Sequence, residues 1–185
     1  MKFNLISNLD NGVGLQQDCL LLQAELLQLG HEASLVHYLN WENPLPDVDI
    51  NIHLELINTK LYPLAKSQWF VPNPEWFFQR DLISTFDKVL AKTQDTVRIF
   101  SEMVNGKTSY LGWKARDLYK PEIKKERAFL HVAGKSQFKN TKAVLDCWTL
   151  YKPGIPLYLV SQHYNGNGIP DVITIPRATD EELTT

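Results

Sequence analysis

The first thirty residues have the pattern of a β-strand joined to an α-helix by a glycine-containing turn. Residues 2–7 include Phe3, Leu5 and Ile6 and have the pattern of a short buried strand, and residues 15–29 carry apolar side chains at helical spacing. Gly12 and Gly14 lie in the turn between them. Such a turn leaves backbone N–H groups unpaired at the helix N-terminus, where the helix dipole favours an anion. The pattern predicts an α/β fold and a phosphate group beside Gly12 and Gly14; a purely structural turn is the alternative.

The same alternation of strands and connections continues through the first two thirds of the chain. Gly30 predicts the end of the first helix, and a second helix is expected from about residue 93 to 104. Strands are expected at residues 32–38, 49–54, 68–71, 86–91 and 107–111. Strands that alternate with helices or crossover loops favour a Rossmann-like parallel sheet covered on both faces.

A charged stretch without clear periodicity interrupts this pattern, and the pattern then begins again. We expect an N-terminal Rossmann-like domain at 1–113, a linker at 114–127 and part of a second Rossmann-like domain at 128–185. The second domain is expected to contain strands at 128–133, 156–161 and 172–175, and a helix capped by Asn140. Thr179 begins a pattern typical of a first helical turn, so this domain is expected to be incomplete.

Positive charge is concentrated in the middle of the chain. Residues 107–152 contain 11 Lys and Arg against 4 Asp and Glu, although the whole chain has a net charge of −2. Lys135 and Lys139 belong to this segment and follow the expected strand at 128–133. Two ammonium groups beside a helix N-terminus would neutralise a diphosphate. The basic segment therefore indicates either an anionic ligand or a solvated linker.

Several classes of protein are not favoured by the sequence. No apolar run is long enough to span a membrane, and two cysteines, Cys19 and Cys147, are too few for a disulfide framework. We therefore expect a cytoplasmic protein. The histidines lack metal-ligand spacing, so no metal is expected, and a pI near 6.2 argues against nucleic acid. Gln17 at the third glycine position makes the dinucleotide fingerprint incomplete, which weakens a nicotinamide-dependent reading.

Several motifs together resemble a known family. They are the turn at residues 11–14, Val71–Phe77, Tyr110–Asp117, His131–Thr141 and Thr179–Leu183. With these motifs the chain resembles the retaining glycosyltransferases of GT-B type, in the group called glycosyltransferase family four. The resemblance implies two Rossmann-like domains with a cleft between them, of which the N-terminal one receives the acceptor and the C-terminal one holds a nucleotide-sugar.

The resemblance also implies roles for individual residues. Gly12, Gly14, Lys135 and Lys139 are expected to bind the donor diphosphate, with Lys135 at a position where the family commonly has an arginine. Glu75, Trp76 and Arg116 are weaker candidates on the acceptor side, and a packed proline turn is the alternative explanation for Glu75 and Trp76.

The expected function is transfer of a sugar from a nucleotide-diphosphate sugar to a hydroxyl acceptor by a possibly truncated glycosyltransferase. No residue is assigned as catalytic, and no cofactor other than the donor substrate is expected. The family's later pair of glutamates, which grip the sugar and the ribose, is missing from the chain. The alternative is therefore a non-catalytic binding or scaffold protein that retains the GT-B-like fold.

Overall fold

The computed structural model contains two compact units, Met1–Arg116 and Asp117–Thr185. It describes residues 1–10, 14–40, 47–115, 117, 119–134, 137–179 and 182. The division falls within the stretch at 114–127. We call the two parts the N-terminal unit and the C-terminal unit and describe each by itself.

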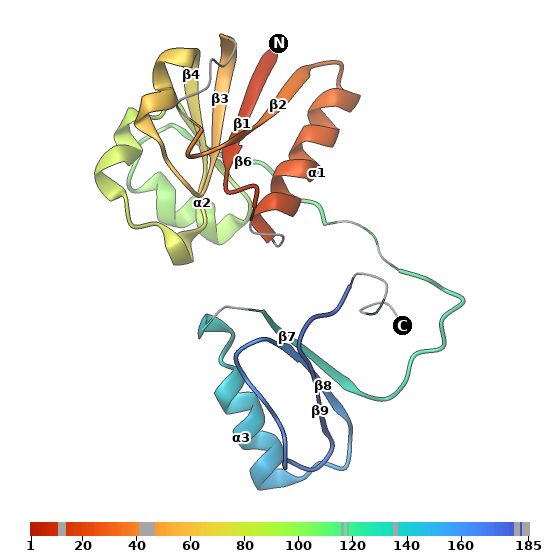
Figure 1. Ribbon diagram of the computed structural model, residues 1–185. Coiled ribbons are helices and arrows are strands. Elements are labelled where there is room, and N and C mark those ends of the chain that lie inside the picture. Colours follow the sequence, from red (N-terminus) through yellow and green to blue (C-terminus); the bar gives the residue numbers. More distant parts are fainter. Residues whose placement is uncertain are drawn as a thin grey trace. The chain divides into compact units, whose positions relative to one another are not determined.

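The N-terminal unit is built on a six-stranded sheet in which all paired strands are parallel (Figure 1). The strand order is β2-β1-β3-β4-β5-β6. The strands are β1 (Lys2–Ser7), β2 (Glu32–His37), β3 (Val48–Leu54), β4 (Ala65–Val71), β5 (Lys88–Ala91) and β6 (Thr108–Tyr110). Because the chain moves from β1 to β2 in one direction and returns to place β3 on the other side of β1, the strand order reverses between β1 and β3.

Two different sets of elements cover the faces of this sheet. Helix α1 (Gly14–Gln28) packs its leucines against one face, where Leu5, Ile52 and Leu54 are buried. A second cluster, which is rich in aromatic residues and includes Phe70 and Phe100, involves the elements that follow other strands. These elements are helix α2 (Gln94–Ser101) and the short 3-10 helices η1 (Thr59–Leu64), η2 (Pro74–Trp76) and η3 (Arg80–Thr85). Each strand contributes side chains to both faces, because successive side chains along a strand point to opposite sides of the sheet.

The face opposite α1 also buries a row of polar side chains. The Asn4 amide donates to the Asn51 side chain at 3.1 Å, and the Asn51 amide donates to the Leu61 carbonyl at 2.8 Å. His53 lies 3.3 Å from the Gln68 side-chain oxygen and is fully buried. These hydrogen bonds satisfy several of the polar groups that would otherwise be costly to remove from water, whereas Asn4 Oδ1 has no hydrogen-bond partner among the described residues.

The C-terminal unit has a smaller parallel sheet in the order β7-β8-β9. Its elements are β7 (Phe129–Gly134), η4 (Gln137–Lys139), α3 (Thr141–Tyr151), β8 (Leu157–Ser161) and β9 (Val172–Ile175). Trp148 of α3 packs edge-on against Phe129 of β7 and donates its indole N–H to the Ile155 carbonyl at 3.0 Å. Strand β7, helix α3 and strand β8 therefore form a parallel βαβ unit.

The α/β fold class with Rossmann-like parallel sheets is confirmed, and so is the helix end at Gly30. Gly30 has φ 78°, and the next N–H, that of His31, donates to the Leu26 carbonyl at 3.0 Å. The expected cap by Asn140 is wrong. Asn140 precedes α3 but has φ 50° and ψ 40°, whereas a capping side chain needs an extended backbone to reach the first turn.

Candidate functional site

The carboxyl ends of β1 and β3 mark the point where the strand order of the N-terminal unit reverses. In open parallel sheets, ligands bind in the crevice beyond the strand ends at such a point. Ser7 ends β1, and its hydroxyl donates to the Leu54 carbonyl at the end of β3, 3.0 Å away. This bond joins the carboxyl ends of the two strands. We call the end of the sheet at which its parallel strands terminate the carboxyl edge.

Glu55 follows β3 at the carboxyl edge and has an unusual backbone. Its φ is 62°, in the left-handed region that costs non-glycine residues about 1 kcal/mol or more. Its N–H still donates to the Val71 carbonyl at 3.0 Å, so the backbone remains tied to β4. Burial raises the pKa of the Glu55 carboxyl, although Lys92 and an Asn73 side-chain hydrogen bond act in the opposite direction. A strained backbone that holds a half-desolvated carboxyl is typical of functional sites.

Lys92 follows β5 and connects the groups around Glu55. Its ammonium forms an ion pair with Asp18 of α1 and lies 3.9 Å from a Glu55 carboxylate oxygen. The same ammonium lies 4.8 Å from the centre of the Trp113 ring, and the Trp113 indole N–H donates to Asp18 at 3.2 Å. Side chains from α1, from the residues directly after β3 and β5, and from the segment after β6 therefore meet at one point.

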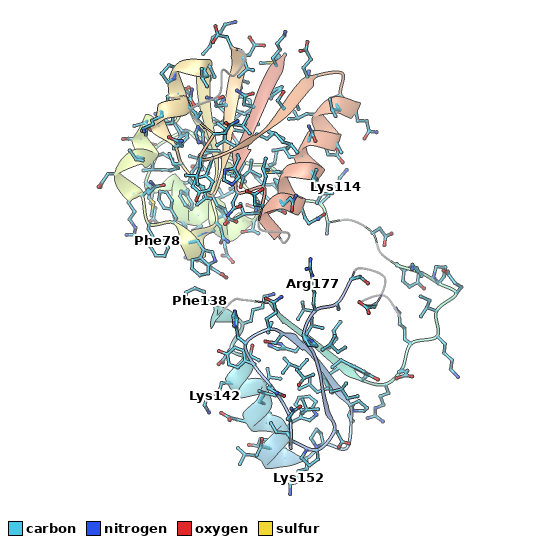
Figure 2. The ribbon with its side chains drawn as sticks, in the orientation of Figure 1. Phe78, Lys114, Phe138, Lys142, Lys152 and Arg177 are labelled. Carbon is cyan, nitrogen blue, oxygen red and sulfur yellow. The ribbon has the colours of Figure 1, made fainter. Side chains whose placement is uncertain are left out.

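Two hollows open beside the Glu55–Lys92 pair. One, of about 250 Å³, is lined by Glu55, Tyr38 and three aromatic residues that follow β4, Trp76, Phe77 and Phe78. We call it the aromatic hollow. The other, of about 390 Å³, is lined by Lys92 together with Glu75 and Asp95. Phe78 lies in the part of the unit where the strands of the sheet end (Figure 2).

The charges at the carboxyl edge favour neutral ligands over phosphate. Asp18 and Glu55 share the single ammonium of Lys92, and Asp10 pairs with His37 at 3.3 Å. An added anion would face these carboxylates at short range, where like charges repel.

Most of the residues expected to bind a ligand in the N-terminal unit can be placed. Gly14 is the first residue of α1, and a Cβ atom built on it has no neighbour within 4 Å. Glu75 and Trp76 lie in η2, which is capped by the Asn73 side chain. They line different hollows, Glu75 the one beside Lys92 and Trp76 the aromatic one. Gly12 and Arg116 fall outside the described residues.

Lys139 lies at a polar corner of the C-terminal unit, between the end of β7 and the start of α3. Its ammonium donates to the Val132 carbonyl at 2.7 Å. His131 lies 3.0 Å from the buried Thr141 hydroxyl, and burial followed by the charge of Lys139 lowers the pKa of His131. The first turn of α3 has no side-chain cap from Asn140. We call this group of residues the Lys139 corner; Lys135 falls outside the described residues.

Sequence reasoning missed Asp18, Glu55, Lys92 and Trp113. A usable signal was present for two of them, because Glu55 and Lys92 directly follow β3 and β5, and residues at the carboxyl ends of parallel strands meet at one edge. Asp18 and Trp113 carried no such signal, since a helical carboxylate and a tryptophan beyond a strand occur in many surroundings.

No protein-family model matches the chain, and a search of curated proteins likewise finds no match. Within the described part of the chain, no three His, Cys, Asp or Glu side chains are placed to hold a metal ion. The helices of the described residues are all too short or too polar to cross a membrane.

Proposed function

We propose that the chain is a glycosyltransferase-like protein that transfers a sugar from a nucleotide-diphosphate sugar to a hydroxyl acceptor. The observation that carries the proposal is the Lys139 corner, where an ammonium stands beside a helix N-terminus at the carboxyl end of a parallel strand. Helix N–H groups that the Asn140 side chain does not cap, the helix dipole and a lysine together suit a diphosphate. The proposal assigns the donor diphosphate to this corner.

The chemistry asked of the corner is charge stabilisation. When the bond between the sugar and the diphosphate breaks, negative charge grows on the leaving phosphate oxygen. A fixed ammonium and helix N–H groups stabilise that charge without having to reorganise. Lys139 is the described side chain assigned to this role, and Lys135 is proposed to act with it.

The N-terminal unit is assigned to the acceptor. Its carboxyl edge has carboxylates that accept hydrogen bonds from hydroxyl groups, and it disfavours a second anion. Glu75, Trp76 and Arg116 keep their proposed place on this side. The protein's contribution would be positioning of the hydroxyl next to the donor sugar.

Calorimetric titration of the full chain with uridine and guanosine diphosphates and their common sugar conjugates tests the donor site. Binding is expected for at least one nucleotide, and Lys139→Ala should weaken it about tenfold, as expected when a charge-assisted contact is lost. Lys142→Ala is the matched control. Lys142 projects from α3 (Figure 2) and pairs with Asp146 at 2.6 Å, so its replacement removes the same charge without removing the corner.

His131 offers a second readout at the same corner. A bound diphosphate near Lys139 should raise the pKa of His131, which a proton NMR titration of the ring detects. Absence of binding by every nucleotide contradicts the transferase and favours the non-catalytic scaffold. Equal weakening by Lys139→Ala and Lys142→Ala removes Lys139 from the site.

A further inference from the structure

The aromatic hollow of the N-terminal unit contains Trp76, which is proposed above for the acceptor side, together with Phe78 and Glu55, which have no role in the proposed function. Trp76 is 46% exposed and Phe78 is 78% exposed, although both are large apolar side chains. Their rings lie edge to face, with centres 6.4 Å apart. Exposed aromatic groups that gather at a hollow mark binding sites, because burying them against a ligand releases water.

A single carboxyl group gives this apolar surface a polar end. Glu55 lines the hollow, and the side chains of Asn73 and Lys92 approach its carboxyl group. Asn73 also accepts a hydrogen bond from the Glu75 N–H at 3.2 Å, in the turn that carries Trp76. The position of the carboxyl is therefore linked to the aromatic wall, and both belong to one preformed site.

Size and charge restrict what such a site accepts. A volume of about 250 Å³ lies just below the range of about 300–1,000 Å³ that is typical of ligand pockets, so the hollow suits a small ligand such as one ring with its substituents. Asp18 and Glu55 repel an anion, whereas Lys92, 3.9 Å from Glu55, repels a second ammonium beside that carboxyl. A neutral molecule with hydroxyl groups experiences neither of these repulsions.

We propose that the aromatic hollow binds the ring of a neutral sugar, whose C–H face packs on Trp76 and Phe78 while a hydroxyl donates to Glu55. One face of a pyranose ring is apolar and its edge is lined with hydroxyl groups, which matches an aromatic wall with a carboxylate at its end. As an acceptor subsite this assignment rests on the proposed transferase; as a sugar-binding site it stands independently.

The test is a tryptophan-fluorescence and NMR titration of the full chain with methyl glycosides of glucose, galactose, mannose, fucose and N-acetylglucosamine. At least one should bind saturably in the millimolar range. Trp76→Ala should weaken that binding about tenfold and Phe78→Ala about threefold, as expected for the loss of an aromatic contact. Phe78→Ala is the variant expected to fold normally, because a side chain exposed to this extent contributes little to the core. A loss of binding in this variant therefore cannot be attributed to misfolding.

Tyr151→Ala is the matched control. Tyr151 ends α3 in the C-terminal unit and is 78% exposed, the same fraction as Phe78. Its replacement should leave sugar affinity unchanged. Equal losses with Tyr151→Ala, or saturable binding of choline without binding of any sugar, would overturn the assignment. Titration with uridine diphosphate should leave the Trp76 signals unchanged, because the hollow disfavours anions.

The outcomes separate this proposal from the donor site. Sugar binding that depends on Trp76, without nucleotide binding, supports the aromatic hollow and contradicts the transferase. Nucleotide binding that depends on Lys139, with no glycoside of the panel binding, supports the donor site and refutes the hollow as a sugar site.

Discussion

Acid should destabilise the N-terminal unit through one buried side chain, His53. This ring is fully buried and lies 5.4 Å from Tyr62 and 5.5 Å from Phe86, measured between ring centres. Burial lowers its pKa from 6.5 to about 4, although the hydrogen bond with Gln68 acts in the opposite direction. The folded protein therefore holds His53 neutral at pH values where the unfolded chain protonates it.

The sign and size of the effect follow from proton linkage. As the pH falls below 6.5, the unfolded chain gains a proton that the folded unit accepts only near pH 4, so stability is lost within this window. A shift of roughly 2.5 pKa units corresponds to about 3 kcal/mol, most of it lost by about pH 4.5. The lowered pKa values of Asp49 and Asp87 act mainly below their ordinary value of 3.8, whereas the raised pKa of Glu55 acts above 4.5 and in the opposite direction, so the comparison with a His53 variant is needed to isolate the histidine.

The assay is urea unfolding at a series of pH values, followed by pulsed hydrogen-exchange mass spectrometry of peptides from β1 and β3. This readout reports on the N-terminal unit alone. His53→Gln should lower stability at pH 7, where packing is lost, and flatten the response between about pH 6.5 and 4.5. His131→Gln, in the other unit, should leave the response of β1 and β3 unchanged. Parallel stability curves for the wild type and His53→Gln would refute the reasoning.

Two further predictions concern cysteine reactivity and the backbone conformation of glycine. A thiol reagent at mild alkaline pH should modify Cys147 in the folded protein and Cys19 only after unfolding. The reason is that Cys147 is exposed, whereas Cys19 is buried and burial raises its pKa to about 11. Cys147→Ser should therefore abolish the reaction of the folded protein. Gly30→Ala should cost about 1 kcal/mol in urea unfolding because Gly30 has φ 78°, whereas Gly14→Ala should be nearly neutral because Gly14 has no such φ and its Cβ meets no atom within 4 Å. Equal effects of the two glycine substitutions would contradict this argument.

The regular elements could be predicted from the sequence because their signals are local. The strand at Lys2–Ser7 and the helix that follows were recognisable from spacing alone, and Gly30 marked the helix end. Thr179 behaves as its pattern predicted, since its hydroxyl accepts the Glu182 N–H at 3.2 Å and the Glu182 carboxylate accepts the Thr179 N–H at 2.7 Å. Residues a few positions apart determine each of these features.

The failure at Asn140 shows the limit of local patterns. Its residue type and its place before α3 are typical of a cap, but its backbone is left-handed and its side chain makes no capping hydrogen bond. Residue type and position in the sequence do not fix the backbone angles of a single residue.

The candidate sites needed the tertiary structure for the same reason. Asp18 and Trp113 are 95 residues apart and share a hydrogen bond, and Lys92 and Asp18 are 74 apart. Their meeting depends on which strands are neighbours, and strand order is set by long-range pairing that periodicity does not encode. The sequence by itself thus determined the elements and their parallel arrangement. The folded sheet alone decided which side chains gather at its carboxyl edge, because only there do distant segments share one edge.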